Sequence, residues 1–268
     1  MHTIQNDALT VTILDPAADR ERMGPRYCTG GYIFQVEDDE GPLLTGPTWP
    51  DSFNWFDGQG IPDSFALGPI WSASASGPRV LIPGIGICDP YARTVVEYCD
   101  WTYTRAPQAI RFVTGHEWDE YSFRIHRTVS LAGRVVRSWT RIENEGPAQL
   151  PIRWFPHPFY PVPDGPQLCS LPAPVTVPDG TTYSVGSDGY LRCSDLSAHT
   201  SVPVRCAEGG PLCVLQRHPR LGLVAARFSF AAGHVLVWGN ERTFSFEPYL
   251  ERTVGVGALL EWEAEYVF

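Results

Sequence analysis

The sequence predicts an all-β protein, a large antiparallel β-sandwich. No apolar pattern with a helical period of 3.6 residues holds over two turns anywhere in the 268 residues. Glycine and proline contribute 25 residues each, which is far too many for a helical protein. Roughly twelve or more short segments alternate between apolar and polar residues at steady intervals, without a repeat of fixed period. We see no domain boundary and expect one domain over residues 1–268.

The N-terminal half contains the clearest strand candidates. The segment from Tyr121 to Leu131 alternates, with apolar residues on one face and polar residues, including His126, on the other. Asp38–Gly41 is typical of a hairpin turn, whereas the charged segment 15–25 predicts a loop or a short helical turn. The predicted strands here are 8–14, 31–37, 79–82, 93–105, 108–114, 120–131, 134–144 and 149–155.

Residues 41–79 alternate little and predict a long loop that carries Trp49, Trp55 and Trp71. A loop of this length inside a compact domain is usually functional. Two interpretations have about equal weight. The indole rings form the rim of a sugar pocket, where they stack on the C–H faces of pyranose rings, or they seal the end of the sandwich.

The C-terminal half begins with a proline-rich connection over residues 156–180. Such a segment packs against a scaffold, because proline fixes φ and favours turns. Residues 181–210 are polar and weakly patterned, which indicates short strands and loops. Strong strand candidates then return at 212–216, 222–230, 234–239, 242–247 and 256–268.

The composition excludes several classes of function. The formal net charge is -10, and the 20 basic residues are all arginine, so we expect no nucleic-acid partner and no lysine Schiff base. The seven cysteines form no CxxC pair, which predicts buried thiols and no metal site built from them. No segment resembles a secretory signal or a membrane span, so we expect a cytoplasmic protein without a membrane partner.

Two stretches could carry chemistry. In the first, residues 154–161, His157 lies between two prolines and among aromatic residues, so its imidazole is held on a stiff, extended backbone. In the second, residues 243–250, Glu247 lies in an aromatic strand that ends at Pro248, and burial raises the pKa of such a carboxyl. Each has a structural alternative: His157 caps a turn, or Glu247 pairs with Arg242 or Arg252.

Together these stretches resemble the aldose 1-epimerase, or galactose mutarotase, family. The resemblance rests on the HPFYP segment, on the preceding Asn144-x-Gly-x-x-x-x-Pro151 pattern and on the late FEPY segment. It implies a β-supersandwich in which His157 is the general acid and Glu247 the general base. A histidine and a carboxylate on opposite sides of the anomeric centre could open and close a sugar ring without a cofactor.

The resemblance has gaps as well as further candidates. The family's second histidine and its substrate-positioning aspartate have no clear counterpart, since His116, Asp188 and Asp195 are weak matches. The expected substrate-binding residues are Arg153, Trp55, Trp71, His126 and Tyr160. Arg153 would lie on the face of His157 and hold a hydroxyl or an anionic group, or alternatively pair with a glutamate on a neighbouring strand.

The sequence therefore predicts a carbohydrate-active isomerase that interconverts the anomers of a free aldose or a sugar derivative. The expected partner is a small carbohydrate, and the expected assembly is a monomer or a homodimer. One alternative is a non-catalytic carbohydrate-binding sandwich that uses the tryptophans at 49–71. Others are a hexose-phosphate epimerase or different sugar chemistry, such as a polysaccharide lyase, on the same fold.

Overall fold

The computed structural model describes residues 1–23, 26–46, 58–65, 70–74, 77–171, 174–198, 201–206 and 210–268. In this part of the chain the regular structure is strands and two short 3₁₀ helices, Arg20–Arg22 and Leu196–Ala198. All of the strand pairings are antiparallel, for example β12 with β13. The all-β prediction is therefore confirmed.

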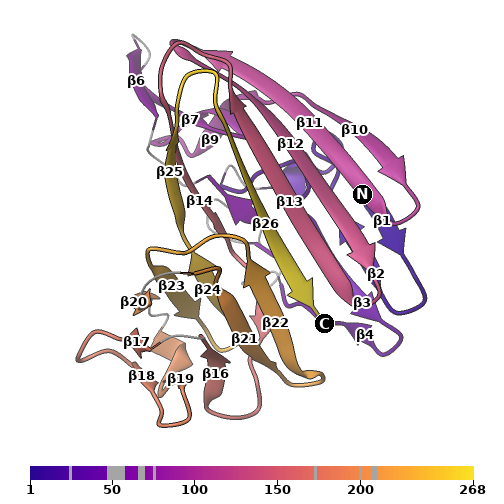
Figure 1. Cartoon of the computed structure of the whole chain (residues 1–268), viewed down its shortest axis with the longest axis vertical. Helices are drawn as coiled ribbons and strands as arrows, with labels where there is room; N and C mark the ends of the chain where they lie inside the picture. The colour runs from indigo at the N-terminus through magenta and orange to yellow at the C-terminus, as the bar shows by residue number, and fades with distance from the viewer. Residues whose placement is uncertain are drawn as a thin grey trace.

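The largest sheet has ten strands, and its long members form one wall of the molecule (Figure 1). In β12 the apolar residues Phe123 and Ile125 are buried, whereas Arg124 between them is exposed, as the alternation predicts. In spatial order the strands are β10 (Trp101–Ala106), β11 (Ala109–Trp118), β12 (Tyr121–Ala132), β13 (Val135–Asn144), β26 (Leu259–Val267), β22 (Gly222–Phe228), β21 (Cys213–His218), β16 (Gln167–Ser170), β19 (Tyr190–Cys193) and β18 (Tyr183–Val185).

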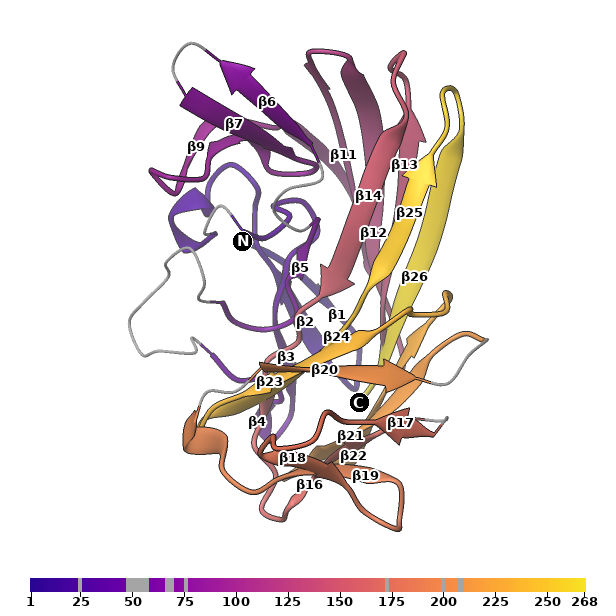
Figure 2. The same ribbon diagram turned by 90° about the vertical axis from the view of Figure 1, so that its left-hand side faces the viewer.

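Smaller sheets face this wall. Figure 2 shows the N-terminal strands and β6, β7 and β9 on one side of the long strands. One four-stranded sheet has the order β1 (His2–Gln5), β2 (Thr10–Ile13), β3 (Ile33–Asp38) and β4 (Gly41–Pro42). A second has the order β6 (Trp71–Ser74), β7 (Gly77–Ile82), β8 (Gly86–Asp89) and β9 (Thr94–Tyr98). Apolar side chains from both layers, such as Val11, Val80 and Phe112, form one buried core.

Two further sheets carry the stretches that the sequence singled out. The three-stranded sheet has the order β25 (Leu250–Val254), β14 (Leu150–Pro156) and β5 (Asp63–Ser64). The five-stranded sheet has the order β15 (Tyr160–Pro161), β24 (Thr243–Pro248), β23 (Val235–Gly239), β20 (Ser201–Cys206) and β17 (Val175–Thr176). Since β14 leads into β15, the chain passes from one sheet to the other through His157.

Some predicted boundaries were wrong. The expected strand 93–105 is two strands, β9 and β10, which lie in different sheets because the chain crosses between layers at residues 99–100. The expected loop 41–79 contains the short strands β4, β5 and β6, and β1 and β25 were not expected. Strands this short show little periodicity, and their backbone partners alone define them. Six of the cysteines are free thiols. Cys28, Cys88, Cys99 and Cys169 are buried as expected, whereas Cys193 and Cys213 are only half-buried.

The Asn144 turn places the start of β14. The Asn144 side-chain amide donates to the carbonyl oxygens of Ala148, at 2.8 Å, and Val254, at 3.0 Å. Its carbonyl oxygen accepts from the N–H of Gly146 at 3.1 Å. At Gly146 a Cβ would lie 2.6 Å from the backbone nitrogen of Ser122, so only glycine fits. The Asn-x-Gly pattern therefore has a structural role: it directs β14 toward His157.

Candidate functional site

His157 follows directly after β14, on backbone that pairs with the segment around β5. The His157 N–H donates to the Pro62 carbonyl at 2.8 Å, and the Phe159 N–H donates to the Gly60 carbonyl at 2.8 Å. Beyond this segment, β15 is the edge strand of its sheet and pairs with β24 alone. Prolines were expected to keep this segment out of the middle of a sheet. That holds for β15, but residues 154–156 lie in β14, the central strand of the three-stranded sheet, where Pro156 pairs with Asp63 of β5.

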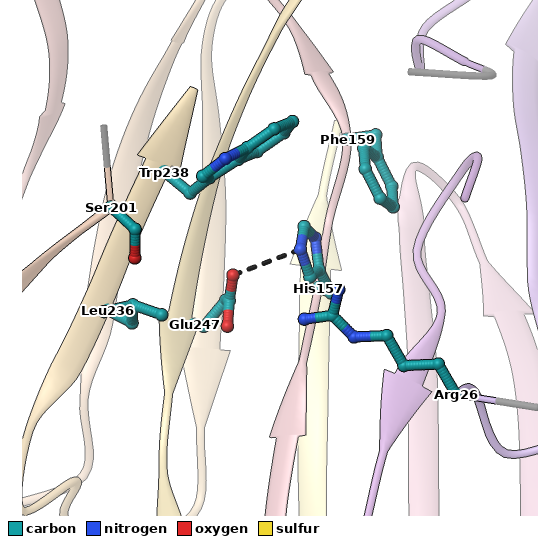
Figure 3. A pocket seen from close by; sticks show the side chains of 7 residues that line it. All are labelled: Arg26, His157, Phe159, Ser201, Leu236, Trp238 and Glu247. Atoms are coloured by element: carbon teal, nitrogen blue, oxygen red, sulfur yellow. Dashed lines mark ion pairs between the residues drawn. The ribbon is translucent and has the colours of Figure 1, made fainter. Parts of the chain in front are cut away.

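Glu247 lies on β24, between β15 and β23, where it pairs with Leu236. The phenylalanines of this strand face the core, and the Phe246 ring stacks on Tyr160 with 5.8 Å between ring centroids. Alternation therefore turns Ser245 and Glu247 to the opposite face. This is the face on which His157 lies (Figure 3).

The two predicted catalytic residues contact one another directly. The Nε2 atom of His157 lies 3.1 Å from Oε1 of Glu247. On the other side of the ring, Ser245 Oγ lies 3.1 Å from Nδ1. His157 is 4% exposed and Glu247 is 2% exposed, so both are almost fully buried. The pair therefore shares one pocket, and neither structural alternative from the sequence, a turn cap or an arginine partner for Glu247 at the sheet rim, describes the contact.

The pocket encloses about 190 Å³, and its described walls are aromatic, aliphatic and charged. The Phe159 ring lies parallel to the His157 ring at 4.5 Å, and the Trp238 ring meets it edge-on at 5.9 Å. The lining residues are Arg26, His157, Phe159, Ser201, Leu236, Trp238 and Glu247 (Figure 3). This volume is below the roughly 300–1,000 Å³ of sites for drug-sized ligands, which favours a ligand as small as one sugar ring.

Burial opposes a charge on either member of the pair. It lowers the pKa of His157 well below the usual 6.5, and the positive charge of Arg26 lowers it further. Burial also raises the pKa of Glu247 to about 7, although Arg26 and the Tyr249 hydroxyl oppose this shift. The Tyr249 hydroxyl donates to Oε2 of Glu247 at 3.4 Å. Near neutral pH the pair therefore gains or loses one proton easily.

The sequence did not predict five of the residues that line the pocket: Arg26, Phe159, Ser201, Leu236 and Trp238. Arg26 lies between the expected loop 15–25 and the expected strand 31–37, and Trp238 lies in an otherwise ordinary strand. Phe159 is part of the HPFYP segment but was not assigned a role. The tryptophans expected to stack on a sugar were those of the long loop, residues 41–79. The pairing of β23 with β24 places Trp238 opposite Ser245, and so on the same face as Glu247.

Arg153 does not line this pocket. Its Nε lies 3.0 Å from Oε1 of Glu251 on the neighbouring strand β25, and its side chain is 46% exposed. Its guanidinium also lies 5.0 Å from the centre of the Tyr249 ring. The alternative of a salt bridge to a neighbouring glutamate is therefore the one observed.

His126 and Tyr160 also lie away from the pocket. His126 lies on the outer face of the ten-stranded sheet, where its Nε2 is 3.5 Å from Oε1 of Glu143 and its Nδ1 is 3.1 Å from Nη2 of Arg111. Tyr160 is fully buried in the core, because alternation along the segment turns it away from His157 and Phe159. A ligand in the pocket would not touch either side chain.

Trp49 and Trp55 lie outside the described residues; Trp71 begins β6, but its side chain is outside the described part of the chain. Asp188 pairs with Arg192 at 2.6 Å, and Asp195 accepts from Ser197. His116 is buried on β11 and does not line the pocket.

Comparisons by sequence found no relatives: no family model matches the chain, and no curated protein is similar to it. Solved structures do match. A galactose mutarotase related enzyme from Lactobacillus acidophilus superimposes with a TM-score of 0.66 at 12% identity, over 99% of this chain and 96% of that one. The chain has the galactose mutarotase-like fold.

Two further structures with this fold match nearly the whole chain. A galactose mutarotase-like protein from Lactobacillus casei gives a TM-score of 0.60 at 13% identity, over 100% of this chain and 99% of that one. A GalM/aldose epimerase homologue from C. elegans gives 0.54 at 9% identity, over 99% and 97%. The galactose mutarotase-like supersandwich that the short motifs implied is therefore confirmed as the fold.

Among the described residues, no group of three or more His, Cys, Asp or Glu side chains could hold a metal ion. None of the helices in the described ranges is long and apolar enough to cross a membrane.

Proposed function

We propose that this protein is an aldose 1-epimerase-like isomerase, which interconverts the anomers of a free aldose by opening and closing the sugar ring. The observation that carries the proposal is the 3.1 Å contact between Nε2 of His157 and Oε1 of Glu247 inside a small pocket. The names of the matching structures, a galactose mutarotase related enzyme and an aldose epimerase homologue, support the same reaction class.

The reaction needs one acid and one base at the anomeric centre. In the competent state the Glu247 carboxylate faces the anomeric hydroxyl, and the protonated His157 ring directs its Nε2–H at the ring oxygen. Glu247 takes the hydroxyl proton while Nε2 gives its proton to the ring oxygen. The bond between the anomeric carbon and the ring oxygen breaks, and a C=O bond forms. Rotation of the aldehyde and the reverse proton transfers close the ring on the other face.

A bound sugar must separate the two groups, because the anomeric hydroxyl and the ring oxygen replace the direct contact between Nε2 and Oε1. The single proton of the pair can lie on His157 or on Glu247, since burial brings the pKa of Glu247 to about 7. The aromatic rings of Phe159 and Trp238 present surfaces on which the C–H face of a pyranose could stack. Stacking and pocket size together would orient the ring for proton transfer.

The direct test is NMR exchange between the α and β anomers of an aldose, measured with and without the protein. We expect His157→Asn and Glu247→Gln each to lower kcat by roughly 10²–10⁴-fold, which is the usual contribution of a general acid or base. Sugar binding should persist in both variants. A rate of exchange that is unchanged in His157→Asn would exclude the mechanism.

The same experiment separates the isomerase from a carbohydrate-binding module. A wild-type protein that binds sugars but never accelerates anomer exchange, and whose binding survives the loss of both His157 and Glu247, would be such a module. Trp238→Ala tests the pocket itself. It should weaken sugar binding whether the protein is an isomerase or a binding module, because the indole forms a wall of the pocket.

A sugar with an anionic group is a second candidate substrate, and one observation favours it. The guanidinium of Arg26 points into the pocket beside His157 (Figure 3). An arginine binds phosphate or carboxylate through paired N–H donors. If Arg26 binds such a group, exchange should be faster for a sugar phosphate than for the neutral aldose. Arg26→Gln should abolish that preference and leave the neutral aldose less affected.

A further inference from the structure

Ser245 contacts the ring nitrogen of His157 that the proposed reaction does not use. Its Oγ lies 3.1 Å from Nδ1, while Oε1 of Glu247 lies 3.1 Å from Nε2. Ser245 and Glu247 are two residues apart on β24 and share one face of that strand. A single strand therefore contacts both nitrogens of the imidazole.

The series Ser245, His157 and Glu247 has the residue types of a hydrolytic triad, but Ser245 is not placed as a nucleophile. It is fully buried, and it is not among the residues that line the pocket. A substrate carbonyl in the pocket would meet His157 and Glu247 before it could reach the hydroxyl. The geometry leaves Ser245 a role that acts through His157.

The aromatic neighbours of His157 fix the plane of its ring. Phe159 stacks on one face at 4.5 Å, and Tyr27 and Trp238 meet the ring edge-on at 5.9 Å each. These contacts do not distinguish nitrogen from carbon, so a ring flipped by a half turn about Cβ–Cγ would fit between them. After such a flip Ser245 and Glu247 would each face a C–H group, and both hydrogen bonds would be lost.

We propose that Ser245 is a positioning residue: its hydroxyl anchors Nδ1 and so keeps Nε2 as the nitrogen that exchanges protons with Glu247 and the sugar. The proposal rests on the function proposed above. A hydroxyl can both accept and donate, so Ser245 stays bonded to Nδ1 when the ring gains or loses a proton. During ring opening the proton on Nδ1 stays in place, and the proton on Nε2 moves to the ring oxygen.

Thr243 provides a matched control on the same strand. It is fully buried, and alternation places it on the face of Ser245. Its hydroxyl donates to the Tyr160 carbonyl at 2.8 Å and is not part of the pocket. Thr243→Val therefore deletes an equally buried hydroxyl that does not bond to His157. The charged and titratable groups around the ring, Glu247, Arg26 and Tyr27, are present in every variant.

The experiment combines NMR of the histidine ring nitrogens in ¹⁵N-histidine-labelled protein with anomer-exchange kinetics, on the wild type, Ser245→Ala, Ser245→Thr and Thr243→Val. We expect Ser245→Ala to shift the Nδ1 resonance of His157 and to lower kcat about tenfold, with KM within about twofold. Ser245→Thr keeps a hydroxyl and should restore both readouts toward the wild type. Thr243→Val should leave the Nδ1 resonance and kcat unchanged.

An Nδ1 resonance in Ser245→Ala that matches the wild type would overturn the proposal. So would a loss of kcat in Thr243→Val as large as that in Ser245→Ala, because the effect would then be one of strand packing. The two proposals fail separately. If the wild type accelerates no anomer exchange, the proposed function is wrong, while the NMR comparison alone still decides whether Ser245 anchors the ring.

Discussion

At the scale of single residues, desolvation governs the chemistry available to this protein. His157 and Glu247 are both buried, and the same environment lowers the pKa of the imidazole and raises that of the carboxyl to about 7. Arg26 pushes both groups in one direction, toward loss of a proton. The pair therefore behaves as one unit that carries a single exchangeable proton, and this proton is the one that the proposed reaction needs.

This coupling predicts the pH dependence of the rate. The competent pair holds one proton, which leaves as the pH rises through about 7. A second proton binds only at a pH well below 6.5, where His157 is charged even when Glu247 is neutral. We therefore expect kcat/KM to be highest in slightly acidic solution and to fall roughly tenfold per pH unit above the upper pKa.

The measurement is anomer exchange followed from about pH 5 to about pH 9, with the spontaneous rate subtracted at each pH. Glu247→Gln removes the group that titrates near neutrality, so the residual rate of that variant should lose the upper limb of the profile. An activity that rises through pH 7 to an alkaline plateau would contradict the shared-proton description.

At the scale of elements, two strand ends create the site and neither would suffice alone. His157 follows the end of β14, and its backbone N–H donates to the Pro62 carbonyl. Ser245 and Glu247 lie on one face of β24. The Asn144 turn controls where β14 begins, since the Asn144 amide donates to the Ala148 carbonyl across the turn and to the Val254 carbonyl at the end of β25. The Asn-x-Gly pattern can thus serve the site through geometry alone.

Asn144→Ala should lower the free energy of unfolding by about 2–4 kcal/mol, because it removes several hydrogen bonds in a buried turn. Urea denaturation measures this change. Asn6→Ala is the matched control: Asn6 also bonds to backbone groups at a turn, but at a more exposed site, and it should cost about 1 kcal/mol. Equal losses in the two variants would refute a special role for Asn144.

At the scale of the whole molecule, a buried ion pair links the ten-stranded sheet to the site. Arg127 of β12 contacts Asp63 of β5 through both carboxylate oxygens, one of them at 2.6 Å, and Ser138 on β13 at 3.1 Å. Asp63 directly follows Pro62, whose carbonyl holds the N–H of His157. The ten-stranded sheet therefore fixes the position of the segment at Pro62 and Asp63, to which the His157 backbone is hydrogen-bonded.

Arg127→Met should destabilise the protein by about 3–5 kcal/mol, because it leaves the Asp63 carboxylate buried without its partner. Replacing both partners with apolar residues should cost less than replacing Arg127 alone. Arg137→Met on the outer face of the same sheet is the control, since Arg137 is half exposed and its partner Glu265 keeps a second partner, Arg227, so the loss should be small. Thermal denaturation of the four proteins checks the order, and an Arg127→Met variant as stable as Arg137→Met would contradict it.

The sequence by itself determined the strand content, the alternation of strands such as β12, and the two stretches that hold His157 and Glu247. These features are local, because the period of the side chains and the proline positions act within a few residues. Only the tertiary structure decided which side chains meet across the sheets. Arg26, Trp238, Ser245 and the ion pair of Asp63 with Arg127 have no local signature, since strand pairing and crossings between layers set their neighbours. For the same reason Arg153, His126 and Tyr160, which had suitable chemistry, lie on other faces and away from the pocket.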